Sequence, residues 1–150
     1  MARKKNALRL HEIAELDTTD PKKVPTSWLP LAKWISEITD DTDESSEETG
    51  YYDGDGTPTT DIVSIAEKWT VTGMYDAKDA AQALVASKKR SLGEERKVWH
   101  RITQTDGKVF QEIATLSEIK AGTGEATAYE EFSCILNFDQ IPKEVTTPEG

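Results

Sequence analysis

Hydrophobic and polar side chains alternate most regularly between residues 60 and 73. Val63, Ile65, Trp69 and Val71 fall on one side of an extended chain, and serine, lysine and threonine residues fall on the other. A period of two with β-branched and aromatic residues is typical of a strand that buries one face. The segment is therefore predicted to be a strand of the core sheet.

The period changes after this strand, because apolar residues then recur every three or four positions. The stripe predicts a helix over about residues 77–91. Asp79 and Gln82 stand at the spacing of a capping box, and the basic run 88–90 suits the negative end of the helix dipole. Gly93 is a suitable stop. The stripe consists of Ala77, Ala80, Ala81, Leu84 and Val85.

Three more strands are predicted after the helix, in residues 95–104, 108–116 and 127–138. The first two are joined by Asp106-Gly107, a dipeptide that readily forms a tight turn. In the first strand, alternation places Lys97, Trp99 and Arg101 on one face. Basic residues beside an aromatic ring can form a stacking platform for nucleic acid. An ordinary strand face, exposed or directed at another subunit, is the interpretation that we favour.

The chain before residue 60 is less regular. Residues 28–39 mix apolar residues in the manner of a strand, and Pro30 there favours a strand start or a sheet edge. A long polar stretch follows at 40–59, which we predict to be a loop. Together these elements predict a mainly β fold: an antiparallel β-sandwich or barrel with one flanking α-helix and a long loop between the first two core strands.

A chain of 150 residues fits one domain with a single core. Residues 1–26 carry mixed charge and two prolines, so we expect an N-terminal arm outside the core. Residues 27–140 would form the β domain, and 141–150 a C-terminal tail. No apolar run is long enough to span a bilayer, and no secretory signal follows the basic N-terminus. We therefore expect no membrane anchor.

Negative charge is concentrated in one part of the chain. The net charge is −10, and residues 27–61 contain ten acidic residues but only one basic residue, Lys33. Such a surface does not adhere to DNA, because binding to phosphates depends on basic residues that displace counterions. The simplest interpretation of an acidic run is a solvated loop.

Motifs for catalysis or metal binding are not found. The single cysteine, Cys134, lies in an apolar run and is predicted to be buried and inert. His11 and His100 are far apart in the sequence, and neither has a second ligand at metal-binding spacing. The run 53–56 begins like a calcium loop, but its glycine comes too early and no glutamate follows in step. We therefore predict no catalytic site, no cofactor and no metal.

Three segments in this order resemble the tail tube (major tail) proteins of siphophages. In that family an aspartate-x-alanine-glutamine-like step commonly begins the single helix. The resemblance covers roughly residues 28–140. The segments are Trp28-Leu29-Pro30-Leu31-Ala32-Lys33, the acidic stretch that ends in Tyr51-Tyr52-Asp53-Gly54-Asp55-Gly56-Thr57-Pro58, and the run Thr72-Gly73-Met74-Tyr75-Asp76 that leads to Asp79-Ala80-Ala81-Gln82.

The resemblance implies a structural virion protein that assembles with itself into hexameric rings, and these rings would stack into a hollow tail tube. It implies assembly in the bacterial cytoplasm with a tape-measure protein and tail chaperones. DNA would pass through the lumen without specific binding, and an acidic lumen would repel phosphates. The loop 40–59 would contact neighbouring subunits through Asp40, Asp41, Asp43, Glu44, Glu47, Glu48, Tyr51, Tyr52, Asp53 and Asp55.

Two other interpretations remain open. An acidic single-domain binding module, such as a DNA mimic or a protein that docks on a basic partner, would stay a monomer or dimer. A related ring protein, such as a tail terminator or the tube of a secretion system, would share the fold. A terminator would stop at one ring.

Overall fold

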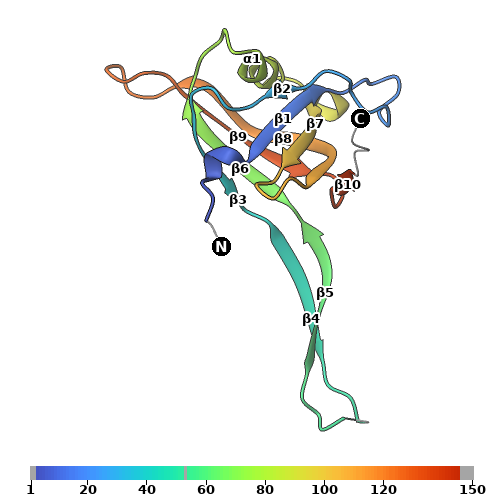
Figure 1. The fold of residues 1–150 in the computed structure, drawn as a ribbon. Coiled ribbons are helices and arrows are strands. Elements are labelled where there is room, and N and C mark those ends of the chain that lie inside the picture. The colour runs from blue at the N-terminus through green and yellow to red at the C-terminus, as the bar shows by residue number, and fades with distance from the viewer. Residues whose placement is uncertain (1–2, 53, 146–150) are drawn as a thin grey trace.

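The computed structural model describes residues 3–52 and 54–145. Within these ranges the chain is mainly antiparallel β-structure, with one α-helix, α1 (Ala80–Ser87), and two 3-10 helices, η1 (Asn6–Leu8) and η2 (Gly93–Arg96) (Figure 1). No helix there is long and apolar enough to cross a membrane. The strands are β1 (Leu10–Glu15), β2 (Leu29–Pro30), β3 (Ile35–Asp40), β4 (Asp43–Thr49), β5 (Thr59–Ala66), β6 (Lys68–Met74), β7 (Lys97–Thr103), β8 (Val109–Thr123), β9 (Glu131–Phe138) and β10 (Lys143–Val145).

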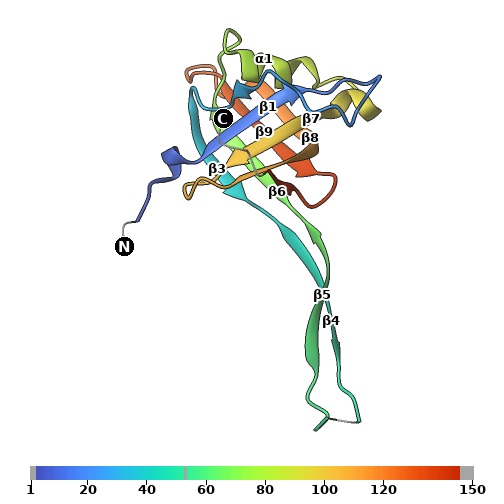
Figure 2. The same ribbon diagram turned by 45° about the vertical axis from the view of Figure 1, so that its right-hand side comes forward.

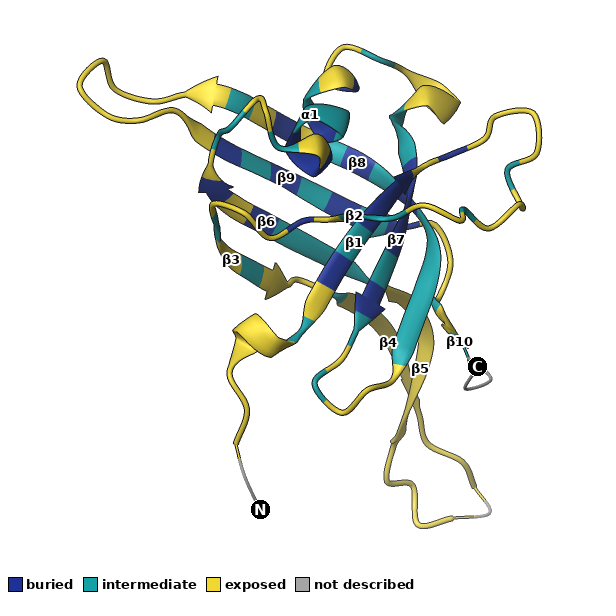
Figure 3. Ribbon diagram, turned by 45° about the horizontal axis from the view of Figure 1, so that its top comes forward, coloured by how far each residue is buried: buried dark blue, intermediate teal, exposed yellow. Residues whose placement is uncertain are grey.

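Eight strands form one curled sheet with the order β2-β1-β7-β8-β9-β6-β3, and β10 pairs with β8 beside this path. Every pair is antiparallel, and the sheet bends into a half-barrel (Figure 3). The short strand β2, which contains Pro30, lies at one edge, as the proline indicated. The predicted class, a mainly antiparallel β fold with one flanking helix, is confirmed.

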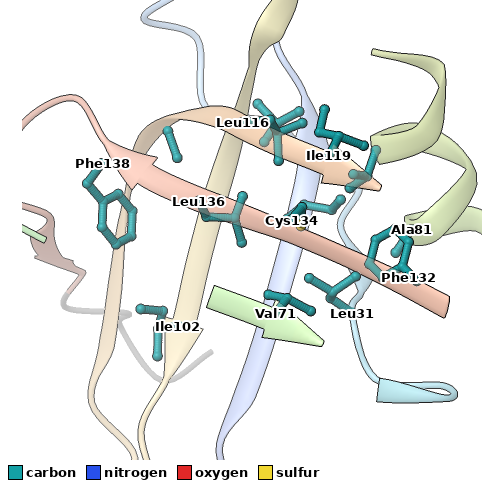
Figure 4. Close-up of a cluster of buried hydrophobic side chains, with 14 residues drawn as sticks. Leu31, Val71, Ala81, Ile102, Leu116, Ile119, Phe132, Cys134, Leu136 and Phe138 are labelled. Atoms are coloured by element: carbon teal, nitrogen blue, oxygen red, sulfur yellow. The ribbon is translucent and has the colours of Figure 1, made fainter. Parts of the chain in front are cut away.

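The core fills the inner face of this half-barrel. Along β9, Phe132, Cys134, Leu136 and Phe138 are buried, and the residues between them face outward (Figure 4). Truncating a fully buried phenylalanine such as Phe132 to alanine costs about 3–5 kcal/mol, because the transfer free energy is lost and a cavity remains. Cys134 is buried as predicted, and burial raises the pKa of its thiol to about 12.

Helix α1 covers the core with Ala81 and Val85, and Asp79 is its N-cap, as predicted. The Asp79 carboxylate accepts a hydrogen bond from the Gln82 backbone N–H at 3.2 Å. The helix ends at Ser87, earlier than the predicted 91. After Val85 the backbone N–H groups of Lys88 and Lys89 bond to carbonyls three residues back, which is the tighter pattern of a 3-10 turn. Gly93 is therefore not the helix stop; with φ of +63° it begins η2.

The predicted N-terminal arm, residues 1–26, is wrong for one segment. Residues Leu10–Glu15 form β1, which pairs with β7 along its whole length, and Ile13 is fully buried. The acidic side chains of β1 obscured this strand in the sequence. They are neutralised by ion pairs: Glu12 pairs with Arg101 at 2.7 Å on the outer face, and Glu15 pairs at 3.0 Å with Lys88, which follows α1. In the predicted C-terminal tail, 143–145 form β10, and 146–150 lie outside the described residues.

The segment 40–59 is not an irregular loop. Its first half forms β4, which pairs with β5 in a hairpin that continues the β3–β6 pair away from the sheet (Figures 1 and 2). The Asp41 N–H donates to the Lys68 carbonyl at 2.9 Å where the two pairs meet. Every residue of β4 and β5 is exposed, so β4 has no buried face and hence no apolar alternation for a sequence pattern to detect.

The outer face of β7 is not exposed, contrary to our expectation for Lys97, Trp99 and Arg101. Trp99 is only 7% exposed, because Trp28 and Leu16 pack beside it in a second small cluster. The Arg101 guanidinium lies 4.3 Å from the Trp28 ring centroid. The segment before β2 therefore covers this face, and its basic and aromatic residues are already engaged within the chain.

Candidate assembly surfaces

The acidic residues predicted to contact other subunits lie on the protruding hairpin or at its base. Asp40 ends β3, Asp41 follows it, and the others lie in β4 or at the hairpin tip. The described members of this set are all exposed, and Asp53 lies outside the described residues. Between residues 34 and 67 the sequence contains no lysine or arginine. The hairpin is thus an acidic projection without a cation of its own, and only at its base does Lys68 pair with one of its members, Asp43. Its described members are Asp40, Asp41, Asp43, Glu44, Glu47, Glu48, Tyr51, Tyr52 and Asp55.

A β-bulge places two isoleucines on one face of this hairpin. Ile65 pairs with Glu44 and Ile62 with Ser46, so Val63 is the extra residue between them. Because paired residues share a face and alternate along β4, Ile62 and Ile65 lie on the same face. Without the bulge, their odd spacing would place them on opposite faces. They are 51% and 41% exposed, an unusual state for isoleucine.

Strand β3 leaves one edge of the sheet open. It pairs with β6 on one side, and the described chain provides no strand on its other side. The short β2 covers only two residues of β1 at the opposite end of the sheet. Open edges present unpaired N–H and C=O groups and are ready templates for another chain. The half-barrel is therefore suited to continuation by neighbouring sheets.

The outer side of β6, β8 and β9 carries mainly hydroxyl and amide groups. We call it the hydroxyl face. Two lysines at its margin are paired: Lys68 with Asp43 at 2.9 Å and Lys97 with Asp139 at 2.5 Å. These hydrogen bonds raise the pKa of both ammonium groups. The face is thus polar, and Lys120 of β8, which is exposed and lies opposite Ser133, adds one cation to it. It comprises Thr70, Thr72, Thr115, Ser117, Ser133 and Asn137.

An apolar cleft of about 540 Å³ lies where β3 begins and β6 ends. We call it the Trp34 cleft; Trp34, Met74, Tyr75, Asp76 and Tyr129 line it. Trp34, Met74 and Tyr129 are 56%, 48% and 87% exposed. The Trp34 indole N–H donates to the Asp76 carboxylate at 3.0 Å, which fixes the ring at the cleft wall. The sequence carries no signal for this cleft, because its residues come from three segments that are far apart along the chain: the β2–β3 connection, the end of β6 with the residues after it, and the connection before β9.

The fold brings together the two histidines that lie far apart in the sequence. His11 Nδ1 is 3.1 Å from His100 Nε2, and both rings are buried. The Arg9 side chain donates to His11 Nε2 at 3.1 Å, so His11 Nδ1 carries the proton that it donates to His100. Among the described residues, no group of three or more histidine, cysteine or acidic side chains could hold a metal ion.

No family model matches the chain, and no curated protein matches it in sequence. Three solved structures are similar to it in fold. A chain from the tail of an empty gene transfer agent (GTA) particle, determined by helical refinement with C6 symmetry, has a TM-score of 0.69 and is 12% identical; the match covers 96% of this chain and 100% of that one. A chain from the virion of a native GTA particle has a TM-score of 0.67 and is 8% identical; the match covers 96% of this chain and 100% of that one.

The third is a chain of the anti-feeding prophage cap, described as a tube terminating cap. It has a TM-score of 0.54 and is 13% identical, with 98% of this chain and 93% of that chain covered. The similarity to each GTA chain extends over its whole length. The chain therefore has the fold of these GTA tail and virion chains, which it shares more distantly with a tube terminating cap.

Proposed function

We propose that this chain is a tail tube protein: a structural, non-catalytic subunit of a long-tailed phage or a phage-like particle. It assembles into hexameric rings that stack into the tube through which DNA is ejected. The observation that carries the proposal is the full-length likeness to a chain in a GTA particle tail with C6 symmetry. Shared fold alone does not fix function, so the surfaces of this chain must also suit such an assembly.

The open sheet edges support the formation of rings. A half-barrel with a free β3 edge resembles one segment of a larger barrel, and closure around a ring removes every exposed edge. Six copies related by one rotation would each present β3 to the next copy. Such a head-to-tail contact is heterologous, and it closes when the rotation is a whole fraction of a turn.

The hairpin supports contact between subunits. A two-stranded hairpin is marginally stable by itself in water, and here its two strands bury no residue. We infer that the predicted acidic set and the two tip tyrosines, Tyr51 and Tyr52, contact neighbouring subunits in the tube. The unbroken negative charge of residues 34–67 keeps free subunits apart in dilute solution until a complementary surface is available.

The hydroxyl face suits a lumen through which DNA moves. Its threonine, serine and asparagine side chains carry no charge, and the marginal lysines are neutralised by Asp43 and Asp139, so that Lys120, opposite Ser133, adds one exposed cation to this face. A duplex in contact with such a wall releases few counterions and is therefore not held. A lumen wall with few unpaired cations is sufficient for passage, and repulsion of phosphates by acidic side chains adds to it.

Electron microscopy of the purified full-length protein tests the proposal. The protein is examined alone at rising concentration, and also with the tape-measure protein and the tail chaperones of its own particle. We expect hollow tubes of stacked rings with sixfold symmetry, formed either by the purified protein alone or by its mixture with these partners. In a producing host, we expect the same tubes to assemble in the cytoplasm. A chain that stays monomeric in every mixture and binds a basic protein would instead be the acidic binding module.

A tube cap is the second candidate, because the fold likeness extends to a tube terminating cap. A cap and a tube subunit differ in one measurable property: a cap forms a single ring and does not elongate. Micrographs that contain isolated rings at all concentrations, and that show these rings only at the ends of tubes made by another protein, would favour the cap. The higher TM-score with the GTA tail chain supports the tube.

A further inference from the structure

Trp34 is held in a strained conformation at the cleft that bears its name. Its φ is +66°, a region that costs a non-glycine residue about 1–3 kcal/mol. Gly73 permits this conformation, because a Cβ at that position would lie 2.2 Å from the Trp34 carbonyl oxygen. This backbone conformation directs the Trp34 indole to the surface, where about half of the side chain is exposed, instead of into the core.

The residues of the Trp34 cleft are those that dominate protein interfaces. Tryptophan, tyrosine and methionine are enriched at such contacts, and clustered aromatic anchors supply most of their binding energy. Trp34, Met74 and Tyr129 together expose a contiguous apolar surface around the cleft. A partner with a narrow apolar ridge would fit this surface.

The same chain offers such a ridge on its hairpin. Ile62 and Ile65 share one face, and their cross-strand neighbours on it are Glu44, Ser46 and Glu48. The two surfaces lie on one continuous antiparallel ribbon, the cleft at its end and the isoleucines in the basal half of the hairpin. Ile35 pairs with Gly73 beside the cleft, and the hairpin projects from the other end of the β3–β6 pair (Figures 1 and 2).

From this arrangement we propose that the Trp34 cleft receives the isoleucine face of the hairpin of a second copy, stacked along the ribbon axis. The contact is head-to-tail, so every copy except those at the two ends of a stack has both surfaces covered. The inference rests on the proposed tube function and assigns the receiving surface that the tube proposal leaves open. Each copy of the chain carries one cleft and one hairpin, so a stack of identical copies provides one isoleucine face for every cleft.

Charge at the cleft favours this occupant. The Lys33 side chain is 63% exposed, with its ammonium 5.9 Å from the Trp34 ring centroid and 3.9 Å from the Asp76 carboxylate. The hairpin has no cation of its own, and Glu44 and Glu48 lie on its isoleucine face. An approaching hairpin therefore brings carboxylates toward Lys33, which the Asp76 carboxylate contacts only at 3.9 Å; Asp76 itself, on the cleft wall, opposes part of this attraction.

Disulfide crosslinking between two full-length variants tests the contact. Ile65→Cys and Tyr129→Cys are made separately, one with a mass tag, and are mixed before assembly and mild oxidation. Cys134 remains in both, because it is buried and its thiol has a pKa raised to about 12. We expect a dominant heterodimeric crosslink. Val24→Cys, exposed in the segment before β2, replaces Tyr129→Cys as the matched control and should crosslink at least tenfold less.

A charge swap provides an independent measurement. Lys33→Glu should stop stacking and leave single rings, and adding Glu48→Lys in the same chain should restore tubes. Thermal melting of the unassembled variants checks that each folds, since Lys33, Ile65 and Tyr129 are exposed.

The outcomes separate this inference from the tube function itself. Tubes that form without the 65–129 crosslink would overturn the cleft assignment and leave the tube function intact. A crosslink from position 129 to Leu8→Cys in its place would assign the cleft to a neighbour's N-terminal segment, which also overturns it. A 65–129 crosslink in short stacks that never become tubes supports the contact and contradicts the tube. Monomers without a crosslink contradict both.

Discussion

His11 Nδ1 donates a hydrogen bond to His100 Nε2 over 3.1 Å inside the half-barrel, where water does not reach either ring. Phe138 stacks on His100 at 4.9 Å between centroids, and Trp69 meets His11 edge-on at 5.0 Å. Burial lowers the pKa of His11 to about 4, with the Arg9 charge as a second cause. Burial, and then His11, lower the pKa of His100 well below 6.5.

The first prediction is that the free energy of unfolding decreases in mild acid. Both histidines are neutral in the folded chain and take up protons near pH 6.5 once unfolded, so the unfolded state binds more protons below that pH. Stability is therefore complete above pH 6.5 and is lost as the pH falls toward 4. The shift at His11 alone corresponds to about 3 kcal/mol over this window. Urea titrations of unassembled protein at pH 7.0, 5.5 and 4.5 measure it.

The matched variant for this experiment is the double substitution His11→Leu/His100→Leu. It replaces both hydrogen-bonded rings with apolar groups of similar volume, so neither histidine is left without its partner, and only the partly exposed Arg9 side chain loses an acceptor. Between pH 7.0 and 4.5 the double variant should lose at least about 3 kcal/mol less stability than the native chain, because the lowered pKa of His100 adds to the contribution of His11. Equal losses in the two proteins would show that carboxylates elsewhere cause the acid sensitivity.

A second prediction concerns Gln82, a fully buried side chain that joins three segments. Its amide donates to the Lys33 carbonyl at 3.2 Å and the Met74 carbonyl at 2.9 Å, and its oxygen accepts from the Asp76 N–H at 2.7 Å. Gln82→Ala should destabilise the chain by about 3 kcal/mol, since these backbone groups lose their partner. Gln104→Ala, at an exposed glutamine, should change stability by less than about 0.5 kcal/mol.

Gln82→Glu distinguishes a lost hydrogen-bond donor from a lost volume. A carboxylate has the size of the amide and still accepts from the Asp76 N–H. Its second oxygen, however, cannot donate to the Lys33 and Met74 carbonyls that it would face. The substitution should therefore destabilise the chain nearly as much as alanine does. A Gln82→Glu protein as stable as the native chain in chemical denaturation would contradict this role for the amide.

The spacing of Asp79 and Gln82 predicted only half of this arrangement. The N-cap is present, but the Gln82 side chain bonds to Asp76 and two carbonyls instead of returning to the N-cap backbone. Local spacing predicts local bonds, whereas the β2–β3 connection reaches Gln82 only after the sheet has folded. The strands β6, β7 and β9 were predictable for a related reason, because each buries at least one regularly alternating face within its own chain.

Elements whose partners lie outside the chain, or far along it, could not be derived in this way. Strand β4 buries neither face, so its sequence resembles a solvated loop. The Trp34 cleft and the histidine pair form where distant segments meet, and a single sequence carries no signal for such proximity. One clue was present: His11 and Ile13 alternate with acidic and small residues in the manner of a half-buried strand.

A third prediction tests the close approach of β6 to the Trp34 backbone. Gly73→Ala would place a methyl group 2.2 Å from the Trp34 carbonyl oxygen and 2.8 Å from the Ile35 Cα. Backbone atoms cannot give way as a flexible side chain does, so we expect a loss of about 3 kcal/mol. Gly54→Ala is the control, because its Cβ would find its nearest neighbour at an ordinary 3.7 Å. Urea denaturation followed by tryptophan fluorescence compares the two.

The last prediction tests the hydroxyl face as the wall along which DNA passes. Ser133→Lys adds a second cation per subunit at the centre of this face, between Thr72 on β6 and the native Lys120 on β8. In a ring of six these lysines would displace counterions from any duplex in the lumen and retain it. Purified open tubes of the variant should hold short duplex DNA at 50 mM salt at least tenfold more tightly than native tubes, and release it at about 200 mM.

Leu92→Lys is the matched control for this variant. Leu92 is 84% exposed in the connection after α1, outside the hydroxyl face, and the added charge is the same. If both variants retain DNA equally, the effect comes from net charge and the hydroxyl face is not the wall. If only Ser133→Lys retains DNA, and high salt abolishes the difference, the lumen is lined by β6, β8 and β9. The native serine and threonine hydroxyls then account for unhindered passage, because they contact phosphates without releasing counterions.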